Sequence, residues 1–358
     1  MSTEMFIQYF FNALALGSLY GLIAIGYTMV YGVLRLINFA HGDFLMLGAY
    51  FFSFSTISFM PAWTAILLIL FAVLIYYSIF IGFKKQQKLY WISAFFILVS
   101  GLIYYLQIAQ QGFKPFWFLA IYFSIFITSA VGILVDQLAY KPLRNAPRIS
   151  VLIGAIGISF LIESLAIMFF SSVPKAVKQP DFLVTPILWY FGQDSNSIIR
   201  IAPMSLIVPI VSFILVIILL WIINKTKPGL AMRAISYDIE TTRLMGVSVN
   251  KIIAFTFCIG SALGAIAGIM WSLRYPQIHP YMGSLPGLKA FIAAVIGGIG
   301  SIPGAMLGGL LLGFIEIMTV AFSPSLSGYR DAFAFILLIL ILLVMPNGLM
   351  GKKNQEKI

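Results

Sequence analysis

Charged residues and cysteines are scarce in this sequence, and the scarcity excludes several classes of protein. Only 9% of the 358 residues are Asp, Glu, Lys or Arg, against about 25% in a soluble domain. Cys258 is the single cysteine, and His41 and His279 are the two histidines. The sequence therefore offers no disulfide framework, no thiolate metal site and no clustered acid–base residues. We expect no catalytic residue, no metal site and no cofactor bound by this chain.

Long apolar runs are what the sequence has in abundance. Hydrophobic residues make up 61% of the chain, and a helix needs about 20 apolar residues to cross a bilayer. The sequence therefore predicts an all-α polytopic membrane protein with about 9–11 transmembrane helices in one domain over 1–358. The first ten residues contain no Lys or Arg, so we expect a retained first span and no secretory signal. The predicted spans lie near 7–33, 39–58, 63–83, 89–106, 116–138, 151–171, 203–223, 252–273, 285–300, 303–322 and 331–350.

The net charge of +11 comes from short basic loops. Such loops set membrane topology and meet anionic lipid headgroups, so we expect contact with membrane lipid and no nucleic acid. With eleven spans and an external N-terminus, every basic cluster falls in the cytoplasm, together with the C-terminus. The segment 172–200 then falls outside. The clusters are Arg35; Lys84, Lys85 and Lys88; Lys141, Arg144 and Arg148; the loop 224–251; and Lys352, Lys353 and Lys357.

The polar loop 224–251 lies between two apolar spans and has the pattern of a structured segment. Pro228-Gly229 predicts a turn, Asp238 is a candidate N-cap, and Gly246 is a natural stop for a short helix over 236–246. A helix of this kind on the cytoplasmic side of a membrane protein predicts a partner that docks there.

Two polar breaks interrupt the apolar sequence. RLINFAHGD over 35–43 collects Asn38, His41, Gly42 and Asp43, and it has two interpretations. One is a short cytoplasmic turn with Gly42 in a left-handed conformation. The other is a helix break that faces a solute pathway, as in many transporters. The second break, GGIGS over 297–301, follows the weakest span, 285–300, which could equally be a re-entrant hairpin with 303–322.

Small residues and isolated acids also stand out within the spans. Small residues recur every fourth position, as in Ala13, Gly17 and Gly21, which predicts close helix packing. Glu163 and Glu316 lie inside apolar runs, where a charge is costly and tends to meet a partner or a solute. For Glu163 we weigh a buried carboxyl that is protonated or pairs with a neighbouring helix against a role in solute passage or subunit pairing. Asp136 is expected at the interface near Lys141.

Several long motifs resemble one known family. GLIAIGYTMVYGVLRLINFAHGDFLMLGAY at 21–50, KAFIAAVIGGIGSIPGAMLGG at 289–309 and LLVMPNGL at 342–349 are similar to the LivH-type permease of branched-chain amino acid ABC importers. GLAMRAISYDIETTRLMGV, followed by FTFCIGSALGAIAGIM, resembles the family's coupling segment and the span after it. The similarity covers nearly the whole chain outside roughly 75–115.

The resemblance implies an ABC importer permease fold in the bacterial cytoplasmic membrane. It also implies four kinds of partner: a LivM-like second permease, two cytoplasmic ATPases that bind ATP and Mg²⁺, and an extracytoplasmic amino-acid-binding protein. By position, Arg233, Asp238, Glu240 and Gly246 match the coupling segment, although Thr241 and Thr242 replace two alanines of its motif. Asn38, His41 and Gly42 match the first break, and Gly297, Gly298, Gly300 and Ser301 match the second.

Two departures from the family and two rival functions remain open. The stretch 75–115 is longer than the family pattern and predicts an extra transmembrane hairpin, and Glu163 stands where the family commonly has an uncharged amide. Within the importer class, urea, an amide or another amino acid is an alternative substrate. An ion-coupled secondary transporter is the other alternative, which would depend on intramembrane acids such as Glu163 and Glu316.

Overall fold

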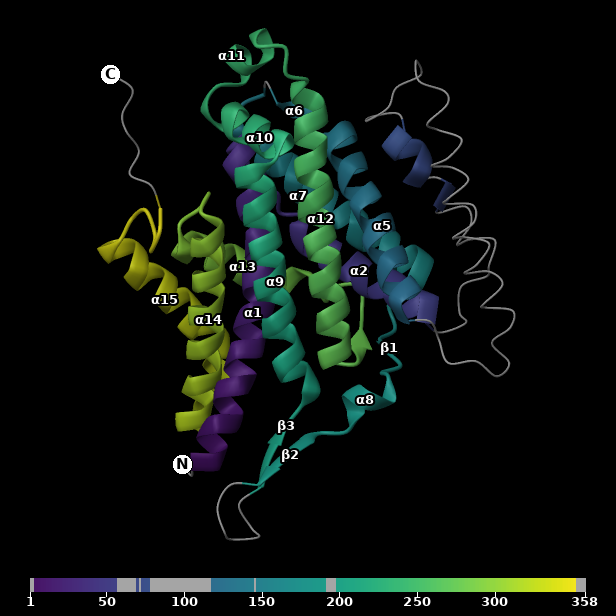
Figure 1. Ribbon diagram of the computed structural model, residues 1–358. Helices are drawn as coiled ribbons and strands as arrows, with labels where there is room; N and C mark the ends of the chain where they lie inside the picture. Colours follow the sequence, from purple (N-terminus) through teal and green to yellow (C-terminus); the bar gives the residue numbers. More distant parts are fainter. Residues whose placement is uncertain are drawn as a thin grey trace.

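The computed structural model describes residues 3–56, 69–70, 72–77, 117–144, 146–190 and 198–351. These residues form a bundle of long helices, which confirms the all-α membrane architecture (Figure 1). Seven of the described helices are long and apolar enough to cross a membrane. The predicted spans 63–83 and 89–106 and the extra hairpin 75–115 lie almost wholly outside the described residues.

The principal helices are α1 (Thr3–Leu34), α2 (His41–Thr56), α5 (Trp117–Val135), α7 (Arg148–Phe170), α9 (Pro203–Lys225), α10 (Lys227–Tyr237), α11 (Ile239–Leu244), α12 (Val249–Arg274), α13 (Ser284–Gly297), α14 (Ile302–Phe322) and α15 (Arg330–Val344). Short elements are η3 (Asp136–Tyr140), α6 (Lys141–Leu143), α8 (Asp181–Val184) and η4 (Pro324–Tyr329). Two small antiparallel pairs join β1 (Lys175–Ala176) to β4 (Gln277–Ile278) and β2 (Ile187–Tyr190) to β3 (Ile198–Ile201).

Helix α1 is the centre of the bundle and packs along α14. A Cβ atom added at Gly17 would lie 2.7 Å from the Cα of Leu310, and one added at Gly309 would overlap the backbone of Gly21. In a membrane, where lipid tails are as apolar as side chains, such close backbone approach is what holds helices together. The predicted packing role of the small residues is confirmed here. It is confirmed again where Gly268 of α12 meets the backbone of α2 at Leu45.

Helix α13 is too short to cross a bilayer on its own. Its 14 residues correspond to about 21 Å at 1.5 Å per residue, against a hydrocarbon core of about 30 Å. Helix α2 begins beside Gly26, eight residues before the end of α1, since a methyl group at Gly26 would overlap the His41 ring. The first turns of α2 and α13 meet, because a Cβ at Gly42 would lie 2.6 Å from the carbonyl oxygen of Gly283. The interpretation of 285–300 as part of a re-entrant hairpin stays a prediction.

The two ends of the bundle differ in character (Figure 1). One end carries α10 and α11 and is called the loop end below. The opposite end, the far end, carries the first residues of α1 and the strand pair β2–β3. The β1–β4 pair ties the segment after α7 to the connection between α12 and α13. Helices α7, α9 and α15 lie at the periphery and expose apolar side chains such as Met168, Ile217 and Leu343.

Candidate functional site

At the loop end, α10 continues almost directly from α9. Thr226 caps its start: the Thr226 hydroxyl accepts from the Gly229 amide at 3.3 Å and donates to the Ile222 carbonyl at 2.5 Å. Pro228 occupies the first turn, where a missing amide proton costs nothing. The predicted turn at Pro228-Gly229 is therefore wrong. Met232 and Ile235 of α10 are buried against the bundle, so this helix is fixed to the membrane core.

Helix α11 stands beyond α10 and matches the predicted capping. Asp238 Oδ1 accepts from the amides of Glu240 and Thr241, at 2.9 and 3.4 Å. Gly246 has φ +81° and ends the segment, as expected of a residue that must adopt a left-handed conformation. The helix itself is shorter than 236–246, because Asp238 separates it from α10.

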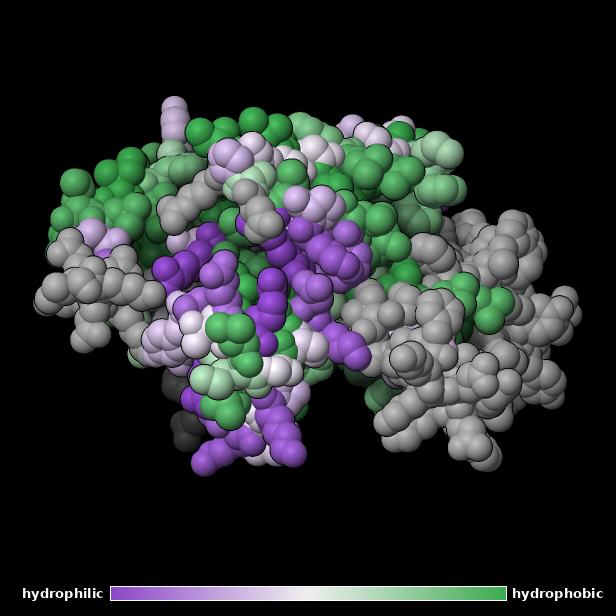
Figure 2. All heavy atoms as spheres, turned by 90° about the horizontal axis from the view of Figure 1, so that it is seen from above, coloured by the Kyte–Doolittle hydropathy of each residue, from purple (hydrophilic) through white to green (hydrophobic). Residues whose placement is uncertain are grey.

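The side chains at this tip face outward. Arg233, Asp238, Glu240 and Gly246 are all exposed. So are Leu244 and Met245, at 87% and 78% of their surface. Figure 2 shows hydrophilic side chains gathered at this end of the molecule, with a few hydrophobic ones among them. Large exposed apolar side chains within a polar surface are typical of a protein-docking site. Sequence reasoning missed Leu244 and Met245, since their exposure follows from where α11 projects.

The break between α1 and α2 is buried in the bundle. Asn38 and His41 are 1% and 0% exposed, and Tyr140 donates to Asn38 Oδ1 at 2.7 Å. The left-handed residue is Arg35, with φ +55°, and its guanidinium reaches the Ser236 carbonyl of α10 at 3.4 Å. Gly42 lies within α2, so the interpretation with a left-handed Gly42 is wrong. Its lack of a side chain instead lets α2 meet α13.

The glycine-rich break joins α13 to α14 in a tight connection. Gly298 and Gly300 have φ +98° and +97°, and Ser301 caps α14 by accepting from the Gly304 amide at 3.2 Å. The segment after α15 covers this connection: the amides of Leu349 and Met350 donate to the carbonyls of Ile296 and Gly297, at 2.9 and 3.0 Å. Those carbonyls lack partners within α13 itself. The structure gives this break a packing role, and a role in a solute pathway stays a prediction.

The intramembrane acids are in two kinds of surroundings. Glu163 is 8% exposed, and it accepts from the Ser284 hydroxyl at the start of α13 at 2.5 Å. This bond to a neighbouring helix agrees with one of the two interpretations weighed for it. Glu316 is 3% exposed and lies in an ion cluster, where it accepts from Lys289 Nζ and the Tyr20 hydroxyl at 3.0 Å each. Arg330 Nε lies 3.5 Å from the same carboxylate.

Asp136, which was expected at the membrane interface near Lys141, is buried within the protein near the loop end. Its side chain is inaccessible to solvent and pairs with Arg144 at 2.6 Å. Arg144 also donates to Asn250 of α12 at 2.8 Å, so the pair fastens η3 to α12 near the loop end. The π-helical turn at 136–140 carries the chain between the two partners.

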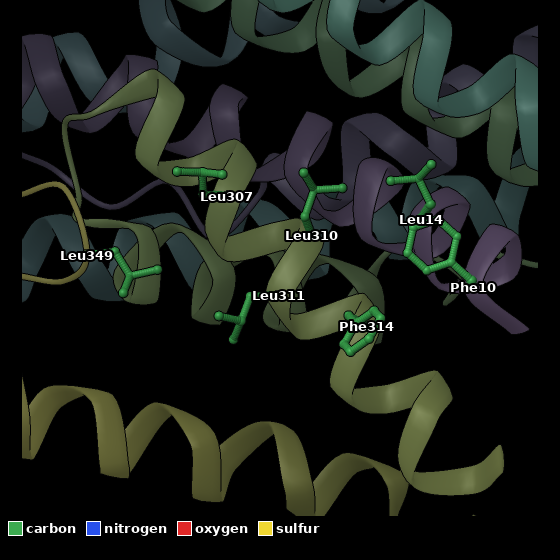
Figure 3. A pocket seen from close by; sticks show the side chains of 7 residues that line it. All are labelled: Phe10, Leu14, Leu307, Leu310, Leu311, Phe314 and Leu349. Atoms are coloured by element: carbon green, nitrogen blue, oxygen red, sulfur yellow. The ribbon is translucent and has the colours of Figure 1, made fainter. Parts of the chain in front are cut away.

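An apolar groove of about 370 Å³ runs between α1 and α14 (Figure 3). In Figure 3 its side chains come from both helices and from Leu349, and none of them is polar. A zwitterionic solute needs polar groups that fix its orientation, so this groove is unsuited to bind one. The lining residues are Phe10, Leu14, Leu307, Leu310, Leu311, Phe314 and Leu349.

These features define a multi-pass membrane protein with two helices that begin inside the bundle and an exposed, partly apolar tip at one end. Residues 9–342 match the family model described as the branched-chain amino acid transport system permease component, and the chain belongs to this family. It is 37% identical over 353 residues to the high-affinity branched-chain amino acid transport system permease protein LivH of Escherichia coli K12, covering 99% of this chain and 98% of that protein.

Two further relatives extend the comparison. The corresponding BraD protein of Pseudomonas aeruginosa is 38% identical over 358 residues, covering 99% of this chain and 98% of the relative. The ribose import permease RbsC of Haemophilus influenzae is 31% identical over 153 residues, which is 41% of this chain and 47% of that protein. No solved structure matches the chain.

Proposed function

We propose that this chain is a transmembrane permease subunit of an ATP-binding-cassette importer, which moves leucine, isoleucine and valine across the bacterial cytoplasmic membrane. The observation that carries the proposal is the match of nearly the full chain to LivH and BraD. A relative that covered a single segment would support only a shared fold. Here the similarity extends over 99% of this chain and 98% of each relative.

Coupling to ATP is the second part of the proposal. ATP and Mg²⁺ would bind two cytoplasmic ATPases, and this chain would act as a transport subunit without catalytic residues. The exposed tip of α11 would dock into a cleft of one ATPase, with Leu244 and Met245 as apolar anchors and Arg233 and Glu240 at the rim. Because α10 is fixed between α9 and the core, movement of the tip would tilt spans directly.

The remaining partners and the orientation follow from the same proposal. A LivM-like second permease would complete the pathway, and an extracytoplasmic amino-acid-binding protein would deliver the substrate. The N-terminus would lie outside, and the loop end and the C-terminus would lie in the cytoplasm. Asn38, His41, Gly42 and Glu163 surround the buried start of α2 and are the side of the bundle that we assign to the pathway. Gly297, Gly298, Gly300 and Ser301 would form its hinge.

The test is affinity purification of the tagged chain from gently solubilised membranes, followed by transport in vesicles. We expect two ATPases and a second permease at near-equal stoichiometry, and ATP-dependent leucine uptake when the binding protein is present. Glu240→Lys should retain the folded permease but lose most of the uptake, whereas Lys225→Gln, an exposed change at the same end, should transport normally.

Other outcomes separate the alternatives. Uptake of urea or acetamide in place of leucine would redirect the substrate assignment and leave the importer class standing. Recovery of the chain alone, with uptake driven by an ion gradient and without ATP, would overturn the proposal in favour of a secondary transporter. Normal uptake by the Glu240→Lys variant would refute docking through α11.

A further inference from the structure

Two acidic side chains lie where α2 contacts α7 and α13. Asp43 is the third residue of α2, and its carboxylate hydrogen-bonds Ser159 of α7. Glu163 lies one turn further along α7 and accepts from Ser284, the first residue of α13. Residues four apart on a helix share a face, so Ser159 and Glu163 both face α2 and α13. Asp43 and Glu163 interact electrostatically.

Among the described residues, this acid pair has no positive partner. None of the ion pairs within the described ranges includes Asp43 or Glu163. Asp43 is 1% exposed, and its Oδ2 atom has no hydrogen-bond partner among the described residues. The contrast with Glu316 is direct, since that buried acid meets Lys289 and Arg330. A buried carboxylate without a partner is costly, and a second carboxylate nearby adds repulsion.

The helix starts compensate part of this cost. Carboxylates are favoured at helix N-termini, where amide groups point outward and the helix dipole is positive. Asp43 is at the start of α2 and Glu163 beside the start of α13, so each acid has one such terminus. The dipole supplies only about half a charge within the first turn. The helix N-termini therefore compensate only part of the negative charge of the two acids. A cation placed between the acids would compensate the remainder.

We propose that Asp43 and Glu163, with the hydroxyls of Ser159 and Ser284, receive the α-ammonium group of an amino acid as it passes through the permease. This inference rests on the proposed function. A primary ammonium group has three donors and no acceptor, which matches carboxylate and hydroxyl oxygens on three helices. The site recognises the α-ammonium group, which leucine, isoleucine and valine have in common. The permease therefore needs no residue that recognises their side chains.

Access to the site requires movement of one peripheral helix. On α7 the stripe of Val151, Ala155, Ile162 and Ala166 is buried, and the flanking positions are mostly exposed. Glu163 lies at the edge of this stripe. A small displacement of α7 would open the acids to a pathway between this chain and a second permease.

The experiment measures thermal unfolding of the purified complex of permeases and ATPases, without binding protein. The probes at millimolar concentration are leucine, 3-methylbutylamine, which lacks the carboxylate, and 4-methylpentanoate, which lacks the ammonium group. We expect leucine and 3-methylbutylamine to raise the unfolding temperature and 4-methylpentanoate to leave it unchanged. Equal protection by 4-methylpentanoate would overturn the proposal. The proposal would also be overturned if leucine had no effect and sodium chloride raised the unfolding temperature more than choline chloride did. That result would indicate a site for a metal cation.

Variants then assign the effect to these residues. Glu163→Gln and Asp43→Asn should each abolish protection by leucine and reduce leucine uptake in vesicles at least tenfold at saturating binding protein. Gly157→Ala, on the exposed face of α7 where an added methyl group meets nothing within 4 Å, should retain both. If leucine still fully protected the Glu163→Gln and Asp43→Asn complexes, and these complexes transported leucine, the ammonium site would be refuted. The proposed function would still stand. A wild-type complex that transports no branched-chain amino acid would instead refute the proposed function.

Discussion

Gly42 shows how one missing side chain positions two helices. Helices α2 and α13 start against each other at this residue, and the nearest atom to an added Cβ is the Gly283 carbonyl oxygen at 2.6 Å. That neighbour is backbone and cannot rotate away. Gly157 on α7 offers a matched contrast, because an added Cβ there would meet nothing within 4 Å.

We expect Gly42→Ala to lower the stability of the purified permease by about 1–3 kcal/mol, the usual cost of forcing a methyl group into a packed interior. Gly157→Ala should leave stability unchanged or raise it by up to about 1 kcal/mol, because alanine is the better helix former. Thermal unfolding in detergent measures both. Equal unfolding temperatures for the two variants would contradict the close approach at Gly42.

Glu316 is the charged centre of the cluster that joins α1, α13, α14 and α15. Replacing Glu316 by Gln leaves Lys289 and Arg330 without their buried counter-charge, although Lys289 keeps Asp331 at 2.6 Å. Removing one partner of a buried pair costs about 3–5 kcal/mol, and we expect the lower part of this range here. The unfolding temperature of Glu316→Gln should fall accordingly.

The control for this prediction removes both charges. In the double variant Lys289→Met with Glu316→Gln, no buried charge of that pair is left uncompensated, so part of the lost stability should return. Strictly additive losses in the double-mutant cycle would show that the two side chains do not interact.

At the scale of elements, α11 is a six-residue helix that depends on its cap. Asp238 accepts from two amides and from the Thr241 hydroxyl, at 2.5 Å for the last. An Asp→Ala change at an N-cap costs about 1 kcal/mol. We therefore expect Asp238→Ala to speed hydrogen exchange of the Glu240 and Thr241 amides about fivefold. Asp238→Ser should restore slow exchange, and unchanged exchange in the alanine variant would contradict the capping role.

The elements that could be predicted from the sequence are those with a local signal. Asp238 and Gly246 bound α11 because capping needs only nearby residues. The prediction of a turn at Pro228-Gly229 was wrong because proline suits a turn and a helix start equally well. In the structure these residues begin α10, which follows α9 so closely that a Cβ at Gly229 would overlap the Ile222 carbonyl.

The candidate site was predictable only as a set of polar residues. Sequence position indicated that Asn38, His41 and Glu163 interrupt apolar runs, and all three are buried. It could not indicate that Asp43 approaches Glu163, because that proximity arises from packing between helices 120 residues apart in sequence. The pairing of Asp136 with Arg144, not Lys141, depends likewise on the π-helical turn between them.

At the scale of the whole molecule, apolar length predicted the spans and missed that α2 and α13 begin inside the bundle. Hydropathy averages over a segment, and 39–58 and 285–300 are mostly apolar. Where each helix begins is set by contacts with α1, at Gly26 for α2 and near Tyr27 for α13. The meeting of these two helix starts places polar side chains such as His41 and Asp43 inside the apolar core.

Orientation is the property on which the coupling proposal depends most. The loop end carries Lys225, Lys227, Arg233, Arg243 and Lys251 against Asp238 and Glu240, and basic loops are retained in the cytoplasm. In a Cys258→Ser background we expect a membrane-impermeant maleimide to label Lys178→Cys on intact cells and Arg243→Cys only after permeabilisation. Both positions are exposed, so burial does not explain a difference. The opposite pattern would place α11 outside, where no ATP is available, and docking to an ATPase would be impossible.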